Sequence, residues 1–360
     1  MNMHDIEWLY NLKKEVDIFL NHIKSSRTPG FFSYTLSGDL YSDSAGWGLG
    51  NAVFVTKIYY TLGLLDDLSN DQRKGLYDFI VQFQNKDGSF SDPLIKRKSC
   101  VRDKLVAFRK FNFNNFFHTE TVRAETRQAI SALKLLDPDY IVSYRQYPQT
   151  VDAVKGFLEK LDWSKPWNAG SHFSHLMFFL SHGNIDNKTS LIDYAVEWVN
   201  KIQHEDGVWY TGKPSLQEKI NGAMKVMTGL RVANRLDFRH PEKLIDLCLV
   251  AANDGHACDN FNVVYVLYHS SIVLQKGYRS EEIKAFAFNR LDIYKQYYHP
   301  DMGGFSFFIS HSNTHYYGAK VSKGLSEPDV HGTVMFLWGL SIIVKILDLE
   351  KGLGFQEFVT

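Results

Sequence analysis

Apolar residues recur with the helical period along most of this chain, and the segments that carry the period are of two alternating kinds. In the first kind the apolar residues form one stripe: in 189–203, Leu191, Ala195 and Trp198 share a face, and Glu197 faces away. This pattern predicts helices with one face in water. The amphipathic segments are roughly 3–24, 69–85, 149–161, 189–203, 240–252 and 279–296.

Segments of the second kind are apolar on nearly every side, so they must be covered by protein on more than one side. Each follows an amphipathic partner, and they span roughly 47–63, 120–136, 169–182, 217–234, 259–275 and 329–347. Outer and inner helices in strict alternation are typical of repeat architectures. We therefore predict an all-α fold, an (α/α)6 toroid with six outer and six inner helices.

Three of the outer helices end in a similar phrase: QNKDGSF at 84–90, QHEDGVW at 203–209 and HPDMGGF at 299–305. Each phrase has a polar first residue, an acidic residue, glycine and an aromatic residue. We expect Gly88, Gly207 and Gly304 to end their helices in the left-handed conformation. The aromatic residue is expected to pack back on its helix, and the glutamine to bond the loop backbone.

No linker rich in Pro, Gly or Ser divides the 360 residues, which predicts a single domain over 1–360. Two long insertions interrupt the hairpins, at about 91–117 and 306–328, and such connections are often functional loops. The 40 basic and 40 acidic residues balance, which argues against nucleic acid as a partner. An odd number of cysteines, no apolar leader and no long apolar run favour a cytoplasmic protein without a membrane span.

The repeated Gln-x-x-x-Gly-x-aromatic phrase resembles the repeat shared by squalene and oxidosqualene cyclases and the β subunits of protein prenyltransferases. The segments RAETRQAISALKLL (123–136) and PDVHGTVMFLWGLSII (328–343) resemble inner helices of that family. The resemblance covers most of the chain. It implies an α/α toroid that holds a small-molecule or isoprenoid substrate in a central cavity, with isomerase or transferase chemistry.

The motifs that carry chemistry in that family are altered in this chain. Class II terpene cyclases protonate their substrates with Asp-x-Asp-Asp-Thr, and the nearest phrase here is DVHGT at 329–333, where His331 takes the place of the acid. The zinc-binding Asp, Cys and His of prenyltransferases are not matched, since Cys258 precedes Asp259. His172 and His175 share a helix face but match no strong zinc spacing. We therefore expect neither a metal nor another cofactor.

The N-terminal ends of inner helices converge on one mouth in a helical ring, where orphan amide groups favour polar ligands. The candidate substrate-binding residues at these helix starts are Trp47, Arg123, Glu125, His172 and Asp259. Helix capping is the competing explanation for any Asp or Asn there.

The insertion at 306–328 adds reactive side chains directly before the last inner helix. We predict His331 as a general acid–base group, Asp329 as the group that orients it, and His315 and Tyr317 as further catalytic residues. Lys320 is expected to bind an anionic part of the substrate.

Two other functions compete with a terpenoid cyclase-like or prenyltransferase-like enzyme. One is a carbohydrate-active (α/α)6 enzyme (a lyase, epimerase or hydrolase), in which Trp47, Trp167 and Trp209 stack on sugar rings. An open groove would favour it, whereas a closed apolar cavity would favour a terpenoid. The other is a non-catalytic ligand-binding ring, favoured if the mouth residues are helix caps. No feature of the sequence specifies an oligomeric state.

Overall fold

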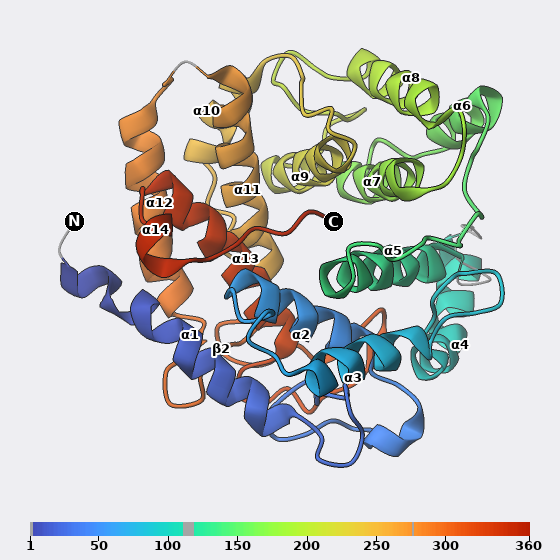
Figure 1. Cartoon of the computed structure of the whole chain (residues 1–360). Helices are drawn as coiled ribbons and strands as arrows, with labels where there is room; N and C mark the ends of the chain where they lie inside the picture. Colours follow the sequence, from blue (N-terminus) through green and yellow to red (C-terminus); the bar gives the residue numbers. More distant parts are fainter. Residues whose placement is uncertain (1–2, 111–118, 276) are drawn as a thin grey trace. The chain divides into compact units, whose positions relative to one another are not determined.

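The computed structural model describes residues 3–110, 119–275 and 277–360 (Figure 1). Fourteen α-helices and four two-residue strands are found in this part of the chain, so the prediction of a mostly helical protein is confirmed. The Phe- and Asn-rich end of the first insertion, at 111–117, lies outside the described residues. None of the described helices is both long and apolar enough to cross a membrane.

All twelve predicted helices are present. The amphipathic segments form α1 (Met3–Ile23), α3 (Asn70–Val81), α6 (Val151–Glu159), α8 (Lys188–Lys201), α10 (Pro241–Leu249) and α12 (Ser280–Lys295). The apolar segments form α2 (Leu49–Thr61), α5 (Thr119–Leu136), α7 (Pro166–His182), α9 (Leu216–Val232), α11 (Ala257–Leu274) and α13 (Val330–Ile346). Burial in α2 and α3 follows the predicted contrast, since nearly every residue of α2 is buried, whereas α3 buries only Leu76, Phe79 and Ile80. In α5, which was predicted to be apolar on nearly every side, only 10 of the 18 residues are buried.

The first insertion is not a loop over its described length, because 93–110 forms a further helix, α4 (Pro93–Lys110). Its start is capped by Asp92, whose Oδ1 accepts hydrogen bonds from the amides of Leu94 at 3.0 Å and Ile95 at 3.2 Å. Proline is favoured at such a first helical position. A short 3-10 helix, η1 (Asp43–Ala45), and α14 (Glu350–Leu353) complete the helices.

Residue contacts divide the chain into two compact units. Unit 1 comprises Met1–Ile141, Leu291–Ser341 and Leu349–Phe358. Unit 2 comprises Val142–Arg290, Ile342–Asp348 and Val359–Thr360.

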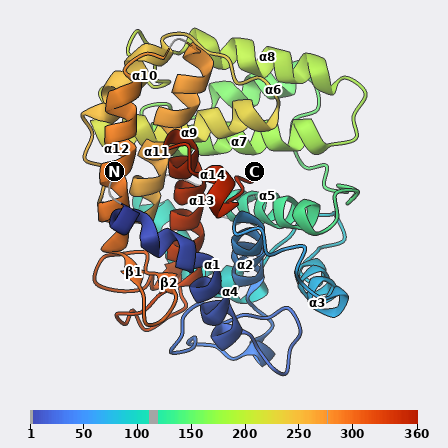
Figure 2. The same cartoon turned by 60° about the vertical axis from the view of Figure 1, so that its left-hand side comes forward.

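The core of unit 2 is built on the packing of α7 against α9, and α11 packs on α9 in turn (Figures 1 and 2). Glycines let these backbones approach closely. A Cβ on Gly170 would lie 2.9 Å from the carbonyl oxygen of Gly222, and one on Gly229 would lie 2.9 Å from Cα of Ser174. The amphipathic helices α6 and α8 pack on each other, and α8 also packs on α7.

In unit 1, α2 packs against both α5 and α3, while α1 contacts a short hairpin of β1 (Tyr298–His299) and β2 (Gly304–Phe305). A second hairpin joins β3 (His315–Tyr316) to β4 (Ala319–Lys320), and β4 contacts α4. Both hairpins are antiparallel. The second one lies inside the predicted insertion at 306–328.

The three repeated phrases fold alike. Gln84 pairs with Phe90 and Gln203 with Trp209 in isolated bridges, and Tyr298 pairs with Phe305 between β1 and β2. As predicted, the Gln203 side chain bonds its own loop, donating from Nε2 to the carbonyl oxygen of Gly207 at 2.8 Å.

The left-handed glycine of the third turn was wrongly assigned. Gly88 and Gly207 have φ values of 79° and 84°, but in the third turn it is Gly303, with φ 80°, that is left-handed, and not Gly304. In all three turns the left-handed glycine lies two residues before the aromatic residue. Gly304 is instead a site of close approach, because a Cβ there would lie 2.8 Å from Cβ of Pro328.

A fourth copy of the turn follows α1 and was not predicted from the sequence. Lys24 pairs with Phe32, and Gly30, two residues before that aromatic residue, has φ 82°. Its two bridging residues are eight positions apart in the sequence, instead of six in the first two phrases, which hides the similarity.

Polar residues of the apolar helices α2, α5 and α13 hold three of these turns in place. Thr126 of α5 accepts a hydrogen bond from the amide of Phe90 at 2.9 Å, and Thr333 of α13 accepts one from the amide of Phe305 at 3.0 Å. Asn51 of α2 donates from Nδ2 to the carbonyl oxygen of Phe32 at 2.8 Å. The same local design thus holds three of the turns to the next apolar helix in the sequence, α2, α5 or α13.

Candidate functional site

His331 is the second residue of α13 and is half-buried between aromatic rings. Its ring is stacked on Phe54 at 4.9 Å between centroids and tilted against Phe307 at 4.7 Å. The amide nitrogen of Asn313 lies 3.2 Å from Nδ1 of His331. Because an amide nitrogen only donates, the neutral imidazole carries its own proton on Nε2. This geometry suits His331 as a hydrogen-bond donor better than as a base.

Asp329 anchors the second insertion. Its Oδ2 accepts hydrogen bonds from the amides of Phe307 at 2.8 Å and Asn313 at 2.9 Å, and its Oδ1 accepts one from Gly332 at 2.7 Å. Backbone amides therefore hold both oxygens of the carboxylate that we expected to orient His331. Asn313 is the side chain bonded to the ring, and sequence reasoning missed it.

The β3–β4 hairpin sends its side chains to two opposite faces, as the two-residue period of a strand requires. Tyr316 and Ala319 pair on the buried face, whereas His315 and Lys320 pair on the exposed face. The predicted catalytic His315 bonds its neighbour Thr314 at 2.8 Å, and neither it nor Lys320 shares the buried face with Tyr316.

Tyr317 lies at the tip of this hairpin in a strained backbone conformation. Tyr317 and Gly318 are the two turn residues, with φ values of 42° and 83°. Positive φ at both positions is typical of a type I′ turn, where Asn-Gly is usual and tyrosine is disfavoured. Strained residues of this kind cluster at functional sites.

The Tyr317 hydroxyl has a raised pKa, although the residue as a whole is partly exposed. The residue is 36% exposed, yet burial around the hydroxyl, together with the nearby charge of Glu125, raises the tyrosine pKa. Arg127 and a hydrogen bond from Tyr316 oppose this rise in pKa. The rings of Tyr316 and Tyr317 are 4.6 Å apart. The charges of Glu125 and Arg127, both on α5, thus act on the pKa of the hydroxyl at the hairpin tip.

Glu125, on α5, is only 2% exposed, and its Oε1 has no hydrogen-bond partner among the described residues. Its other oxygen accepts a hydrogen bond from the backbone amide of Asp92 at 3.2 Å. Burial, and then the charge of Asp92, raises the pKa of Glu125 well above its usual range. Glu125 thus keeps its proton to a much higher pH than an exposed glutamate does.

Asp92 is the member of this carboxyl pair that is built to carry the negative charge. Its oxygens accept four hydrogen bonds from backbone amides at the starts of α2 and α4, two of them from Gly48 at 2.8 Å and Leu49 at 3.3 Å. Burial nevertheless raises the pKa of Asp92 too, against these bonds. The pKa of Glu125 is raised well above its ordinary value and that of Asp92 is raised as well, and the Asp92 charge adds to the rise at Glu125, which therefore holds its proton strongly.

These groups form one cluster within unit 1. The charges of Glu125 and Asp92 and the hydroxyls of Tyr317 and Tyr34 all add to burial in raising the pKa of Tyr316. Tyr34 in turn accepts a hydrogen bond from Asn313 at 3.0 Å, and Asn313 reaches His331. The ring of Tyr316 meets Phe54 edge-on at 5.8 Å. We call Glu125, Tyr316, Tyr317, Asn313 and His331 the acid–base cluster.

Two other predicted residues of unit 1 have different settings. Trp47 is 1% exposed and packs edge-on against Phe31 at 6.2 Å and Tyr41 at 5.9 Å, so it belongs to the core and not to a ligand surface. Arg123 is half-buried near the start of α5, two residues before Glu125.

The predicted residues of unit 2 take part in buried structure. His172 lies within α7 with its ring 5.9 Å from that of His175. Asp259 is 1% exposed and accepts hydrogen bonds from Gln217 at 2.6 Å and Asn221 at 2.9 Å. His256 caps α11 through the Asp259 amide, and its Nε2 lies 3.3 Å from Oδ2 of Asp259. This network joins the starts of α9 and α11, which is the structural role that capping predicts.

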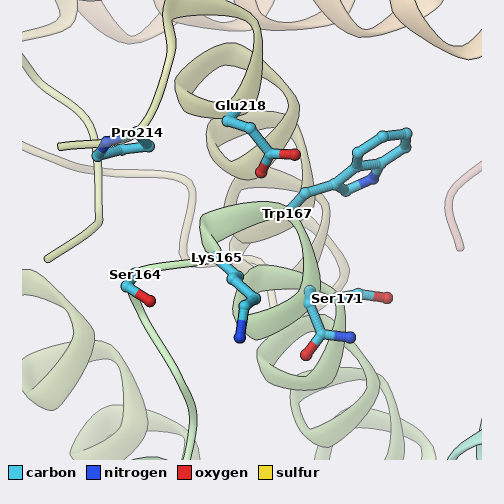
Figure 3. Close-up of a pocket in the computed structure, with 7 residues that line it drawn as sticks. Ser164, Lys165, Trp167, Ser171, Pro214 and Glu218 are labelled. Carbon is cyan, nitrogen blue, oxygen red and sulfur yellow. The ribbon is translucent and has the colours of Figure 1, made fainter. Parts of the chain in front are cut away.

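A pocket of about 540 Å³ opens at the starts of α7 and α9 in unit 2. Figure 3 shows Glu218 and Trp167 on these two helices, with Lys165 just before α7 and Pro214 across the opening. Trp209 is fully buried, as is Trp47, so Trp167 is the one of the three proposed sugar-stacking tryptophans that lines this pocket.

No group of three or more metal-ligating side chains gathers among residues 3–110, 119–275 and 277–360. No protein-family model matches the chain, and no curated protein matches its sequence. The resemblance to terpenoid cyclases and prenyltransferases therefore stays a prediction.

Proposed function

We propose that this chain is an α/α-toroid enzyme, one domain over residues 1–360, that transfers a proton to a small isoprenoid ligand at the acid–base cluster. The twelve alternating helices and the four turns with a left-handed glycine support this ancestry. In this proposal the acid is Glu125, on the inner helix α5, and not the Asp329–His331 pair that stands at the place of the family's protonating motif.

The state of Glu125 carries the proposal. A neutral carboxyl group with an unpartnered oxygen inside the protein is a proton donor held ready for a ligand. Its environment is costly, because a buried polar atom without a partner destabilises the fold by about 1–3 kcal/mol. Perturbed carboxyl groups of this kind concentrate at functional sites.

The raised pKa narrows the choice of substrate group. A weak acid protonates oxygen more readily than carbon, so an isoprenoid epoxide suits Glu125 better than a bare alkene. Opening the epoxide breaks a carbon–oxygen bond, leaves a hydroxyl that holds the donated proton, and creates a carbocation. In this proposal the rings of Phe54 and Phe307, which pack on His331, stabilise the positive charge. The Glu125 carboxylate then takes a proton from carbon, so the net reaction is an isomerisation without a cofactor.

The test is turnover of 2,3-oxidosqualene, squalene and geranylgeraniol by the purified protein, with products separated by gas chromatography and identified by mass spectrometry. We expect conversion of the epoxide, and a loss of about 10²-fold or more in Glu125→Gln, the low end of a general acid contribution. Glu120→Gln, on the same helix, is the matched control and should keep its activity. Failure of all three probes, or an active Glu125→Gln, would overturn the proposal.

A second measurement needs no substrate. Infrared difference spectra between the unmodified protein and Glu125→Gln at neutral pH should contain the carbonyl band of a protonated carboxylic acid. Only carboxylate bands in that difference would show that Glu125 is ionised and cannot be the acid.

A further inference from the structure

We propose that the pocket of unit 2 binds a neutral sugar ring, stacked on Trp167 and hydrogen-bonded by Glu218, Asn168 and Ser171. This is a binding site in addition to the isomerase site of unit 1. Its volume of about 540 Å³ lies within the usual range for small-molecule pockets. All of its lining residues belong to unit 2.

Trp167 provides the aromatic surface. It is half-buried, and its ring lies 6.4 Å from that of His256 at a tilt of 32°. A tryptophan that packs on the protein and also borders a pocket presents its apolar ring face to a ligand, while its polar edge stays in contact with water. The C–H face of a pyranose is complementary to such a surface, while its hydroxyls point to the rim.

The rim carries donors and acceptors of both kinds (Figure 3). Glu218 accepts, Lys165 donates, and Asn168, Ser164 and Ser171 do both. Apolar ligands are disfavoured here, because they would strip water from these groups without replacing its hydrogen bonds. A ligand bearing several hydroxyls satisfies them.

The charges decide against an anion such as phosphate. Lys165 is bonded to Asp162 at 2.6 Å, so its positive charge is already paired. Glu218 adds a negative charge to the lining. Because Lys165 is paired with Asp162, no other residue of the lining balances this charge. The charge distribution of the pocket therefore favours a neutral polyhydroxylated ligand over an anion.

The lining is held in place before any ligand arrives. Ser215 caps α9 by accepting a hydrogen bond from the amide of Glu218 at 3.2 Å, which fixes the backbone of that residue. Asp162 similarly accepts from the amide of Ser164 at 3.2 Å, which fixes the turn that leads to α7. Preorganised groups lose less entropy on binding.

The test is isothermal titration with cellotriose, maltotriose and inorganic phosphate, supported by saturation-transfer NMR. We expect at least one trisaccharide to bind more tightly than phosphate, and Trp167→Ala to weaken binding at least tenfold. Trp167→Phe should retain part of the affinity, and Glu218→Gln should weaken it. Lys213→Ala, an exposed neighbour outside the lining, is the matched control and should bind like the unmodified protein.

Three results would overturn the site: no binding of either trisaccharide, full affinity in Trp167→Ala, or phosphate binding tighter than the sugars. If Trp167→Ala does not fold, as judged by circular dichroism, Trp167→Phe and Glu218→Gln carry the test. Glu125→Gln should bind the sugar normally, so a failure of the isomerase proposal leaves this one standing.

Discussion

Gly303 gives the sharpest test of how the repeated turns are built. It combines a left-handed φ of 80° with close packing, since a Cβ at this position would lie 1.9 Å from the carbonyl oxygen of Glu15 in α1. A backbone oxygen inside a helix cannot move aside without bending the helix. Alanine at 303 must therefore strain its own backbone and also displace α1.

The two costs can be separated with Gly38. That residue has almost the same φ, 81°, but a Cβ there would meet no atom within 4 Å. A left-handed residue with a Cβ costs about 1–2 kcal/mol, and overpacking adds about 1–3 kcal/mol. We expect Gly38→Ala to lower the free energy of unfolding by about 1–2 kcal/mol and Gly303→Ala by about 2–5 kcal/mol.

Urea denaturation followed by circular dichroism measures both variants under one condition. The slope of the transition should match that of the unmodified protein, so that the midpoints compare stabilities directly. Equal losses in the two variants would refute the packing argument. An unchanged Gly38→Ala would refute the conformational one.

Two further predictions concern buried polar groups in unit 1. Burial raises the pKa of Asp39 from its ordinary 3.8 to about 8, so the folded state binds this proton more tightly than the unfolded state, and the free energy of unfolding should fall as the pH rises from about 4 to about 8. In Asp39→Asn the free energy of unfolding should fall less between pH 5 and pH 8 than in the unmodified protein. An identical fall in both proteins would contradict the assignment. Thr333→Val leaves the buried amide of Phe305 without its partner and should cost about 1–3 kcal/mol in urea denaturation. The control Thr228→Val, which removes only a donor to a helical carbonyl, should cost less, and equal costs would contradict the role of Thr333.

Helix positions could be predicted because burial imposes a period on the sequence. The wrong assignment of Gly304 arose from two adjacent glycines, since the pattern alone does not say which of them takes the positive φ. Helix α4 was missed because its basic stretch lacks a strong apolar stripe, and its start depends on Asp92. That aspartate was readable in principle, as an Asp-Pro pair directly after a helix-ending turn.

The chemistry of the site depends on contacts between distant parts of the sequence, which no local pattern encodes. Glu125 was identified only as a polar residue at a helix start. Its raised pKa depends on burial and then on the charge of Asp92, 33 residues earlier, and its companions Tyr316 and Tyr317 come from a hairpin almost 200 residues later. The split of that hairpin into a buried and an exposed face separated Tyr316 from His315, although the two are adjacent in the sequence.

The composition of unit 1 bears on how the protein is made. Its first segment ends at Ile141, but its second begins only at Leu291. The contact of α1 with β2 therefore cannot form until most of the chain has been synthesised. Most of unit 2 leaves the ribosome in between and can acquire its core earlier. Contacts between such distant segments form slowly, and the exposed apolar faces of α1, α2 and α5 are then open to aggregation. We expect the nascent first segment of unit 1 to depend on a chaperone until the last segment of that unit, Leu349–Phe358, has emerged.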